Sequence, residues 1–132
     1  MKKLQSKKGF TMAELLIVVA IIAVLVAISI PIFSARLESS RQATDLANIR
    51  NAYAEVSAAY LTDNTNYQKE VELKHEKDWS TANGDIEIGK TKISAVTNKA
   101  NGSTKVYAVV YMDADGGGVA NSAPAGYTVL SD

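Results

Sequence analysis

Few residues of this chain could carry out chemistry, and they form no catalytic group. The 132 residues include one histidine, His75, and no cysteine, which excludes disulfides, thiolate catalysis and cysteine-ligated zinc. A single histidine argues against a histidine metal cluster or a catalytic triad, and no serine or aspartate pattern indicates a nucleophile with its base. We therefore expect that the protein is not an enzyme. His75 lies among Lys74, Glu76 and Lys77, and we expect it to be exposed.

Asp113 and Asp115 are the candidates for a metal site. Residues 113–116 read DADG, which resembles the opening of a calcium-binding loop. An EF-hand also needs a bidentate glutamate at position twelve, and that position here is Pro124. A turn rich in Asp and Gly explains the same residues. We expect no metal and no cofactor, with calcium as the alternative.

The distribution of charge argues against nucleic acid as a partner. Four of the fourteen basic residues lie before residue 10, so the remaining ten face fourteen acidic residues, a formal charge of −4. Residues 88–112 contain no acid and four lysines, which could contact DNA or an anionic surface: Lys90, Lys92, Lys99 and Lys105. We interpret them as the solvated face of a sheet, because no exposed aromatic residues alternate with them.

Glu14 stands at the start of a long apolar run. Residues 15–33 read LLIVVAIIAVLVAISIPIF, nineteen residues without a charge. As a helix they span about 28 Å, close to the roughly 30 Å of a bilayer core and longer than a secretory signal needs. The run predicts a single membrane-spanning helix with the four N-terminal lysines in the cytoplasm and the rest of the chain outside. Glu14 then either stays at the headgroup boundary or needs a partner cation.

Residues 7–14, which read KKGFTMAE, together with the apolar run resemble the leader and N-terminus of the type IV pilin family. The likeness covers about residues 6–33. It implies that a membrane-embedded prepilin peptidase cuts between Gly9 and Phe10 and methylates the new N-terminus at Phe10. It also implies an assembly ATPase and a platform protein as partners.

The same resemblance gives Glu14 a role in assembly. In the family this glutamate pairs with the N-terminal amine of a neighbouring subunit, here that of Phe10. Two charges about 4 Å apart gain roughly 4 kcal/mol at an effective dielectric of 20, comparable with the roughly 3 kcal/mol cost of a carboxylate in lipid. The alternative is an interaction of Glu14 with the N-terminus of its own helix, which contributes about 0.3–1 kcal/mol.

Helical periodicity continues beyond the apolar run. Pro31 predicts a kink or a locally melted stretch in the filament, or else a tolerated membrane proline. We expect one helix over residues 10–61, and five apolar residues spaced 3, 4, 3 and 4 apart form its packing stripe: Leu46, Ile49, Tyr53, Val56 and Tyr60. Asp45 is assigned with other polar residues to the remaining faces.

The rest of the chain predicts a small head. Residues 67–81 are expected to form a short helix or ordered loop anchored by Trp79, and Asn101-Gly102 predicts a turn. Strands are expected at residues 85–88, 91–96, 104–112 and 127–130. We therefore expect an α+β fold class, with one long N-terminal helix packed against an antiparallel sheet of three or four strands. The resemblance to the type IV pilins implies that this is the type IV pilin fold.

These expectations give three segments: a leader at 1–9, a transmembrane or filament-core half-helix at 10–33, and a globular head at 34–132. The leading hypothesis is a structural subunit of a homo-oligomeric type IV pilus, held in the cytoplasmic membrane before assembly and at the cell surface afterwards. One alternative is a minor pilin or a pseudopilin of a secretion or DNA-uptake machine. Another is a signal-anchored extracytoplasmic binding protein.

Overall fold

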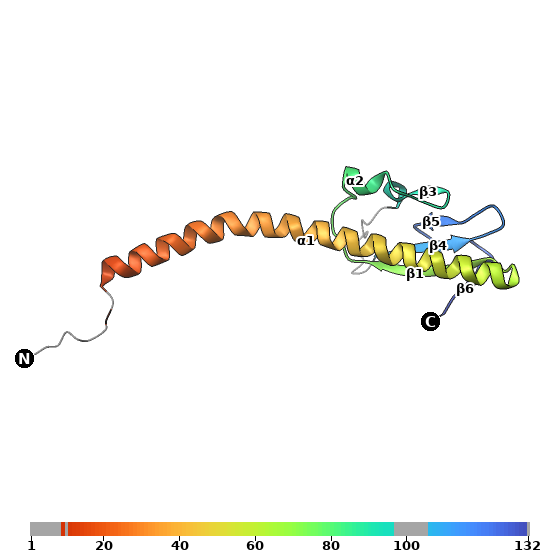
Figure 1. Cartoon of the computed structure of the whole chain (residues 1–132), viewed down its shortest axis with the longest axis horizontal. Helices are drawn as coiled ribbons and strands as arrows, with labels where there is room; N and C mark the ends of the chain where they lie inside the picture. The colour runs from red at the N-terminus through yellow and green to blue at the C-terminus, as the bar shows by residue number, and fades with distance from the viewer. Residues whose placement is uncertain (1–8, 10, 97–105, 132) are drawn as a thin grey trace, which may run out of the picture. The chain divides into compact units, whose positions relative to one another are not determined.

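The computed structural model describes residue 9 and residues 11–96 and 106–131. The chain divides into two compact units, the first ending at Arg36 and the second beginning at Leu37. Helix α1 (Met12–Asp63) begins in the first unit and ends in the second (Figure 1). It is the secondary structure that the first unit contains among its described residues. The predicted long helix is therefore confirmed.

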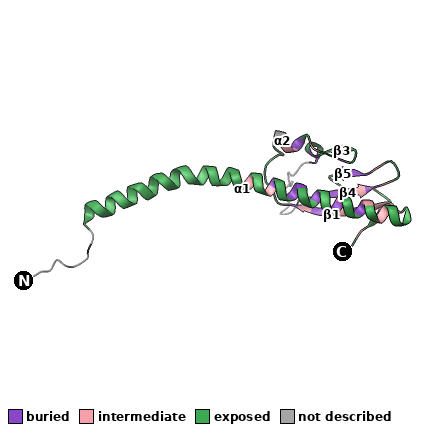
Figure 2. Cartoon of the chain, viewed as in Figure 1, coloured by how far each residue is buried: buried purple, intermediate pink, exposed green. Residues whose placement is uncertain are grey.

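In the first unit, α1 is apolar on all sides. Each of residues 12–36 is exposed, as the green colour of this part of the helix shows (Figure 2). α1 remains helical through Pro31, where the imide nitrogen removes one helical hydrogen bond. The kink at Pro31 stays a prediction.

In the second unit, α1 buries the predicted stripe. Leu46, Ile49 and Val56 are buried, and Tyr53 and Tyr60 are partly buried against the same core. The buried side of the helix also includes three residues outside the predicted stripe: Gln42, Asp45 and Ala52. Asp45 therefore lies on the packed side of α1, and its assignment to the other faces was wrong.

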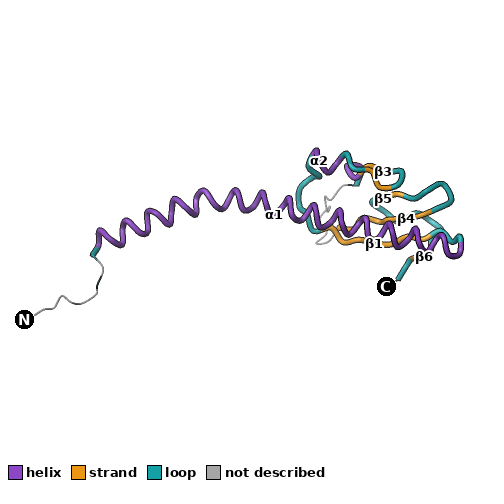
Figure 3. Tube along the Cα trace, in the orientation of Figure 1, coloured by secondary structure: helices purple, strands orange, loops and turns teal. Residues whose placement is uncertain are grey.

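The main sheet has four strands in the order β5-β4-β1-β6 (Figure 3). Strand β1 (Tyr67–Leu73) pairs antiparallel with β4 (Val106–Met112), and β4 pairs antiparallel with β5 (Gly118–Ala120). Strand β6 (Thr128–Val129) instead runs parallel to β1, so the expectation of a fully antiparallel sheet was wrong at this edge. The chain leaves β5 at one edge and reaches β6 at the other, so the intervening residues cross the sheet.

Two strands of this sheet were not predicted. Residues 67–73 form β1 rather than a helix or loop, and residues 118–120, where no strand was expected, form β5. Strand β1 can pack although its sequence is largely polar. Its apolar residues Val71 and Leu73 are buried, and Lys69 forms an ion pair with Glu55 of α1.

The remaining elements form a small second layer of structure. A short helix α2 (Thr81–Gly84) precedes a two-stranded sheet of β2 (Glu87–Ile88) and β3 (Thr91–Lys92), and the 3-10 helix η2 (Ile93–Ala95) follows. The predicted strand at 91–96 is thus only two residues long. The expected Asn101-Gly102 turn and the first residues of the strand expected at 104–112 lie outside the described residues.

The core lies between α1 and the sheet. Ile49 and Val56 of α1 belong to the same buried cluster as Val71 of β1 and Val110 of β4. Trp79 packs against this cluster, and its Nε1–H donates to the carbonyl of Val96 at 3.0 Å. The expectation that Trp79 anchors its segment onto the head is confirmed.

Candidate functional site

The residues around the expected cleavage bond lie just before α1. Gly9 is exposed and outside the helix, whereas Phe10 lies outside the described residues. Apart from Gly9 itself and its two chain neighbours, no heavy atom lies within 4 Å of the position that a Cβ on Gly9 would occupy. A larger side chain at Gly9 would therefore leave the described fold undisturbed.

Thr11 and Glu14 form a reciprocal pair of hydrogen bonds at the start of α1. The backbone N–H of Thr11 donates to Oε2 of Glu14 at 3.0 Å, and the backbone N–H of Glu14 donates to Oγ1 of Thr11 at 3.2 Å. This arrangement is a capping box, which satisfies amides that have no partner inside the helix. In the single chain, the carboxylate of Glu14 thus interacts with the N-terminus of its own helix.

Directly after this box, α1 presents the apolar run. Leu15, Leu16 and Phe33 are 49%, 66% and 68% exposed, and the apolar residues between them are similarly open. By length and composition, α1 is long and apolar enough to cross a membrane. A helix that is apolar on all sides needs lipid or other apolar helices around it. The location of the run near the N-terminus fits a membrane anchor.

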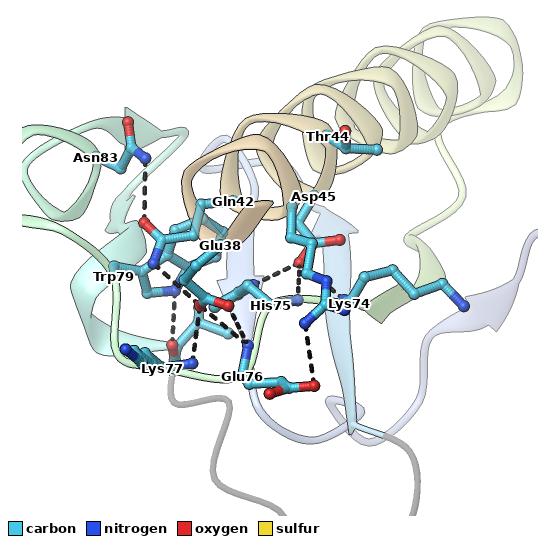
Figure 4. Close-up of polar contacts among 12 residues, drawn as sticks. Glu38, Gln42, Thr44, Asp45, Lys74, His75, Glu76, Lys77, Trp79 and Asn83 are labelled. Carbon is cyan, nitrogen blue, oxygen red and sulfur yellow. Dashed lines mark hydrogen bonds and ion pairs between the residues drawn. The ribbon is translucent and has the colours of Figure 1, made fainter. Parts of the chain in front are cut away.

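A second polar cluster joins α1 to residues 74–80, the segment that follows β1 (Figure 4). Oδ2 of Asp45 accepts the backbone N–H groups of Lys74 and His75, both at 2.8 Å. The Nδ1 atom of His75 lies 2.5 Å from the same oxygen, and both side chains are 0% exposed. His75 is therefore buried, and the expectation that it is exposed was wrong.

Glu38 and Gln42 of α1 accept hydrogen bonds from the later residues of the same 74–80 segment. Glu38 accepts the backbone N–H groups of Glu76 at 3.0 Å and Lys77 at 2.9 Å, and Gln42 accepts that of Ser80 at 3.0 Å (Figure 4). Burial raises the pKa of Glu38, but the bonds from Lys77 and Glu76 outweigh it and hold this pKa below the usual 4.5. The cluster orders a loop on the helix through Oδ2 of Asp45 and the carboxylate of Glu38, whereas Oδ1 of Asp45 is buried with no hydrogen-bond partner among the described residues.

Sequence reasoning missed this cluster, although a signal was present. Gln42, Asp45 and Ile49 follow the 3 and 4 spacing of the buried stripe. Polar side chains at such positions must be hydrogen-bonded when buried, so they predict donors from a partner segment. The partner, residues 74–80, lies some 30 to 40 positions away in the chain and carries no pattern that identifies it.

Asp113 lies at the turn after β4, where both of its carboxylate oxygens are engaged. Oδ2 accepts the hydroxyl of Tyr127 at 2.8 Å, and Oδ1 accepts Nζ of Lys90 at 3.2 Å and the backbone N–H of Asp115 at 2.9 Å. The bond from Tyr127 and those from Lys90 and Asp115 lower the pKa of Asp113 despite its burial, while Asp113 raises the pKa of Tyr127 to about 12. The side chain of Asp113 thus joins the C-terminal segment to the turn before β3.

The lysines of the acid-free stretch do not act as one group where they are described. Lys90 pairs with Asp113, and Lys92 lies 3.8 Å from Asp85. Lys99 and Lys105 lie outside the described residues. Over the described ranges, no group of three acidic or histidine side chains could hold a metal ion.

Comparison with known proteins identifies the N-terminal region. Residues 4–30 match the family described as the prokaryotic N-terminal methylation motif, which is a structural motif and not an enzyme family. Searches of curated proteins and of solved structures gave no significant match. The matched region includes Gly9, Phe10, Glu14 and most of the apolar run. The chain thus carries the type IV prepilin-like signature at its N-terminus, on a single long helix that continues into a pilin-like α+β head.

Proposed function

We propose that this chain is a structural subunit of a type IV pilus filament. The observation that carries the proposal is the order of features at the N-terminal end of the chain. The methylation motif includes Glu14, whose carboxylate caps the start of α1, and an apolar surface exposed on every side of the helix follows. Such a surface is stable only in lipid or against apolar helices. A subunit that moves from membrane to filament needs a surface that suits both surroundings.

Processing comes first in this proposal. A prepilin peptidase removes residues 1–9 by cutting between Gly9 and Phe10, and Phe10 is methylated. Residues 10–33 then serve as the transmembrane and filament-core half-helix, and residues 34–132 as the head. An assembly ATPase and a platform protein move the subunit out of the membrane.

Glu14 makes the docking specific. The capping box occupies Oε2 of Glu14, and the other carboxylate oxygen accepts no hydrogen bond from any residue that the structure describes. That oxygen is suited to accept the Phe10 amine of a neighbouring copy. The attraction favours a subunit docked in register over one alone in lipid.

The proposal places the chain first in the cytoplasmic membrane, with its head outside, and then in a cell-surface filament. It needs no cofactor, no nucleic acid and no catalysis by the chain itself. Asp113 and Asp115 would take calcium only if the bonds of Asp113 to Tyr127 and Lys90 rearranged.

Mass spectrometry of the N-terminal peptide tests this function. The sample is filament sheared from the native cell surface, and the control is a Gly9→Leu chain, whose head should fold normally. A peptide that begins at Phe10 and carries one added methyl group is expected. The same peptide found only in membranes would favour a minor pilin or a pseudopilin, and a mature chain that retains Gly9 would favour an anchored binding protein.

A further inference from the structure

Most charged side chains of the second unit form ion pairs within the chain. On α1, Arg41 pairs with Glu76 and Glu55 with Lys69, and on β1 Glu72 pairs with Lys74. Arg50 of α1 and Glu70 of β1 are among the charged residues that form no such pair. Both are exposed, and neither has a hydrogen bond or ion pair with any other residue that the structure describes.

Arg50 lies on the side of α1 that faces away from β1. The pair between Glu55 and Lys69 defines the side of the helix next to β1. Arg50 precedes Glu55 by five residues, which turns it about 140° around the helix axis. The buried stripe that contains Ile49 separates the two sides.

Glu70 lies at an open edge of the sheet. Strand β6 pairs with β1 only at Tyr67 and Gln68, so no described strand covers the following residues of β1 on that side. Because Lys69 pairs with α1 and strand side chains alternate, Glu70 points away from the helix. Arg50 and Glu70 therefore occupy opposite sides of the same head.

Each side also exposes a large apolar residue. Leu61 is 81% exposed and follows Arg50 by eleven residues, within about 20° of the same direction around α1. Val129 is 66% exposed on β6, beside the edge that carries Glu70. The two sides thus carry unpaired residues of opposite charge, Arg50 and Glu70, and each side has an exposed apolar residue to cover.

We propose that Arg50 of one copy pairs with Glu70 of the next copy in the filament. This pairing rests on the proposed function, because it needs copies that assemble. Contacts between two different surfaces of the same chain are heterologous, and when the rotation does not close they generate an open helical filament. The free opposite charges identify a second copy of this chain as the occupant of each side.

Charge reversal tests the pairing. Arg50→Glu and Glu70→Arg should each lower the amount of sheared filament several-fold, since an exposed ion pair changes an association constant by up to about fivefold and the contact recurs at every subunit. The double variant should restore assembly. Glu87→Arg, a reversal at an exposed site of β2, is the matched control and should leave the yield unchanged.

Two results would overturn the pairing: normal filaments from both single variants, or a double variant no better than either. The N-terminal peptide of each variant must still begin at Phe10, because a loss of cleavage would reveal a processing defect. Wild-type chains that form no filament would overturn the proposed function and the pairing together. Wild-type filaments that persist in every variant would overturn the pairing alone.

Cysteine cross-linking gives an independent readout, because the natural chain has no cysteine. A chain with Arg50→Cys and Glu70→Cys should form a ladder of disulfide-linked oligomers in oxidised filaments. A chain with Arg50→Cys and Glu87→Cys should remain monomeric on the same gel. The reverse pattern would place the neighbour's contact on the small sheet and contradict the proposal.

Discussion

Nδ1 of His75 lies 2.5 Å from Oδ2 of Asp45, and neither side chain is exposed. The same carboxylate oxygen accepts two backbone N–H groups, and the His75 ring lies 4.0 Å from the Trp79 ring, measured between centroids. One buried carboxylate thus fixes the chain as it leaves β1. The segment that follows is tied to α1, the element that the proposed filament would hold.

His75→Ala should lower the free energy of unfolding by about 3 kcal/mol, because it leaves a buried carboxylate with one donor fewer. The measurement is urea unfolding of the full chain in detergent, followed by circular dichroism and by the fluorescence of Trp79, the only tryptophan. His75→Asn should lose less, since its amide can donate from near the position of Nδ1. An exposed control, Lys77→Ala, should have little effect, and an equally small effect of His75→Ala would contradict the structural role of the pair.

Sequence patterns predicted the parts of this molecule that depend on local repetition. The apolar run, the stripe through Leu46, Ile49 and Val56, and most of β4 follow from spacing alone. The N-terminal motif was equally readable, because its residues are consecutive in the chain. These features need no knowledge of what packs against them.

The features that sequence reasoning missed depend on distant partners. His75 looks exposed among charged neighbours, yet it is buried because Asp45, thirty residues earlier, accepts its hydrogen bond. The sequence of strand β1 is typical of a polar loop, and the ion pair between Lys69 and the distant Glu55 of α1 cannot be read from it. Strand β6 is two residues long, and its parallel direction is fixed by bonds to the carbonyls of Asn66 and Gln68.

Acid should weaken the contact between α1 and residues 74–80. The pKa of Glu38 is held below 4.5 in the folded chain, so its contribution is complete above pH 4.5 and is lost as the pH falls through the folded value. Equilibrium unfolding measured between pH 7 and pH 3 should show this loss. In Glu38→Gln the free energy of unfolding should fall less between pH 7 and pH 3 than in the wild type. Some loss should remain, because the pKa of Asp113 is also lowered in the folded chain. Identical acid profiles for the two proteins would refute the role of Glu38.

Alkaline pH should release the C-terminal segment. The bond to Asp113 raises the pKa of Tyr127 from 10 to about 12, so its stabilising effect is complete below pH 10 and is lost between pH 10 and pH 12. The difference in absorbance between the wild type and Tyr127→Phe, followed through a pH titration, isolates this tyrosine from the other five. A difference titration centred at the ordinary value of 10 would contradict the bond.

Calcium should leave the melting temperature of the full chain unchanged. Both oxygens of Asp113 are already engaged, one by Tyr127 and the other by Lys90 and Asp115, so an ion must displace existing bonds. Differential scanning calorimetry with calcium, with magnesium and with a chelator provides the comparison. A rise specific to calcium that disappears in Asp113→Asn would instead establish a site at this turn.

Glu14→Gln separates the two roles of Glu14. Glutamine is the other residue favoured at this position of a capping box, so its oxygen should still accept the Thr11 N–H and α1 should begin at the same residue. The leader should be cleaved as before. The neutral side chain lacks the roughly 4 kcal/mol attraction to the Phe10 amine, so sheared filament should fall by at least about tenfold.

Thr11→Val is the complementary variant. It removes the hydroxyl that accepts the Glu14 N–H, at a cost of about 1 kcal/mol to the helix start, but it retains the carboxylate charge. Quantitative blotting of sheared filament against total processed subunit should give near-normal assembly for Thr11→Val and poor assembly for Glu14→Gln. The opposite ranking would show that the charge of Glu14 is dispensable for assembly. The role of Glu14 would then be to cap its own helix, and assembly would rely on other contacts.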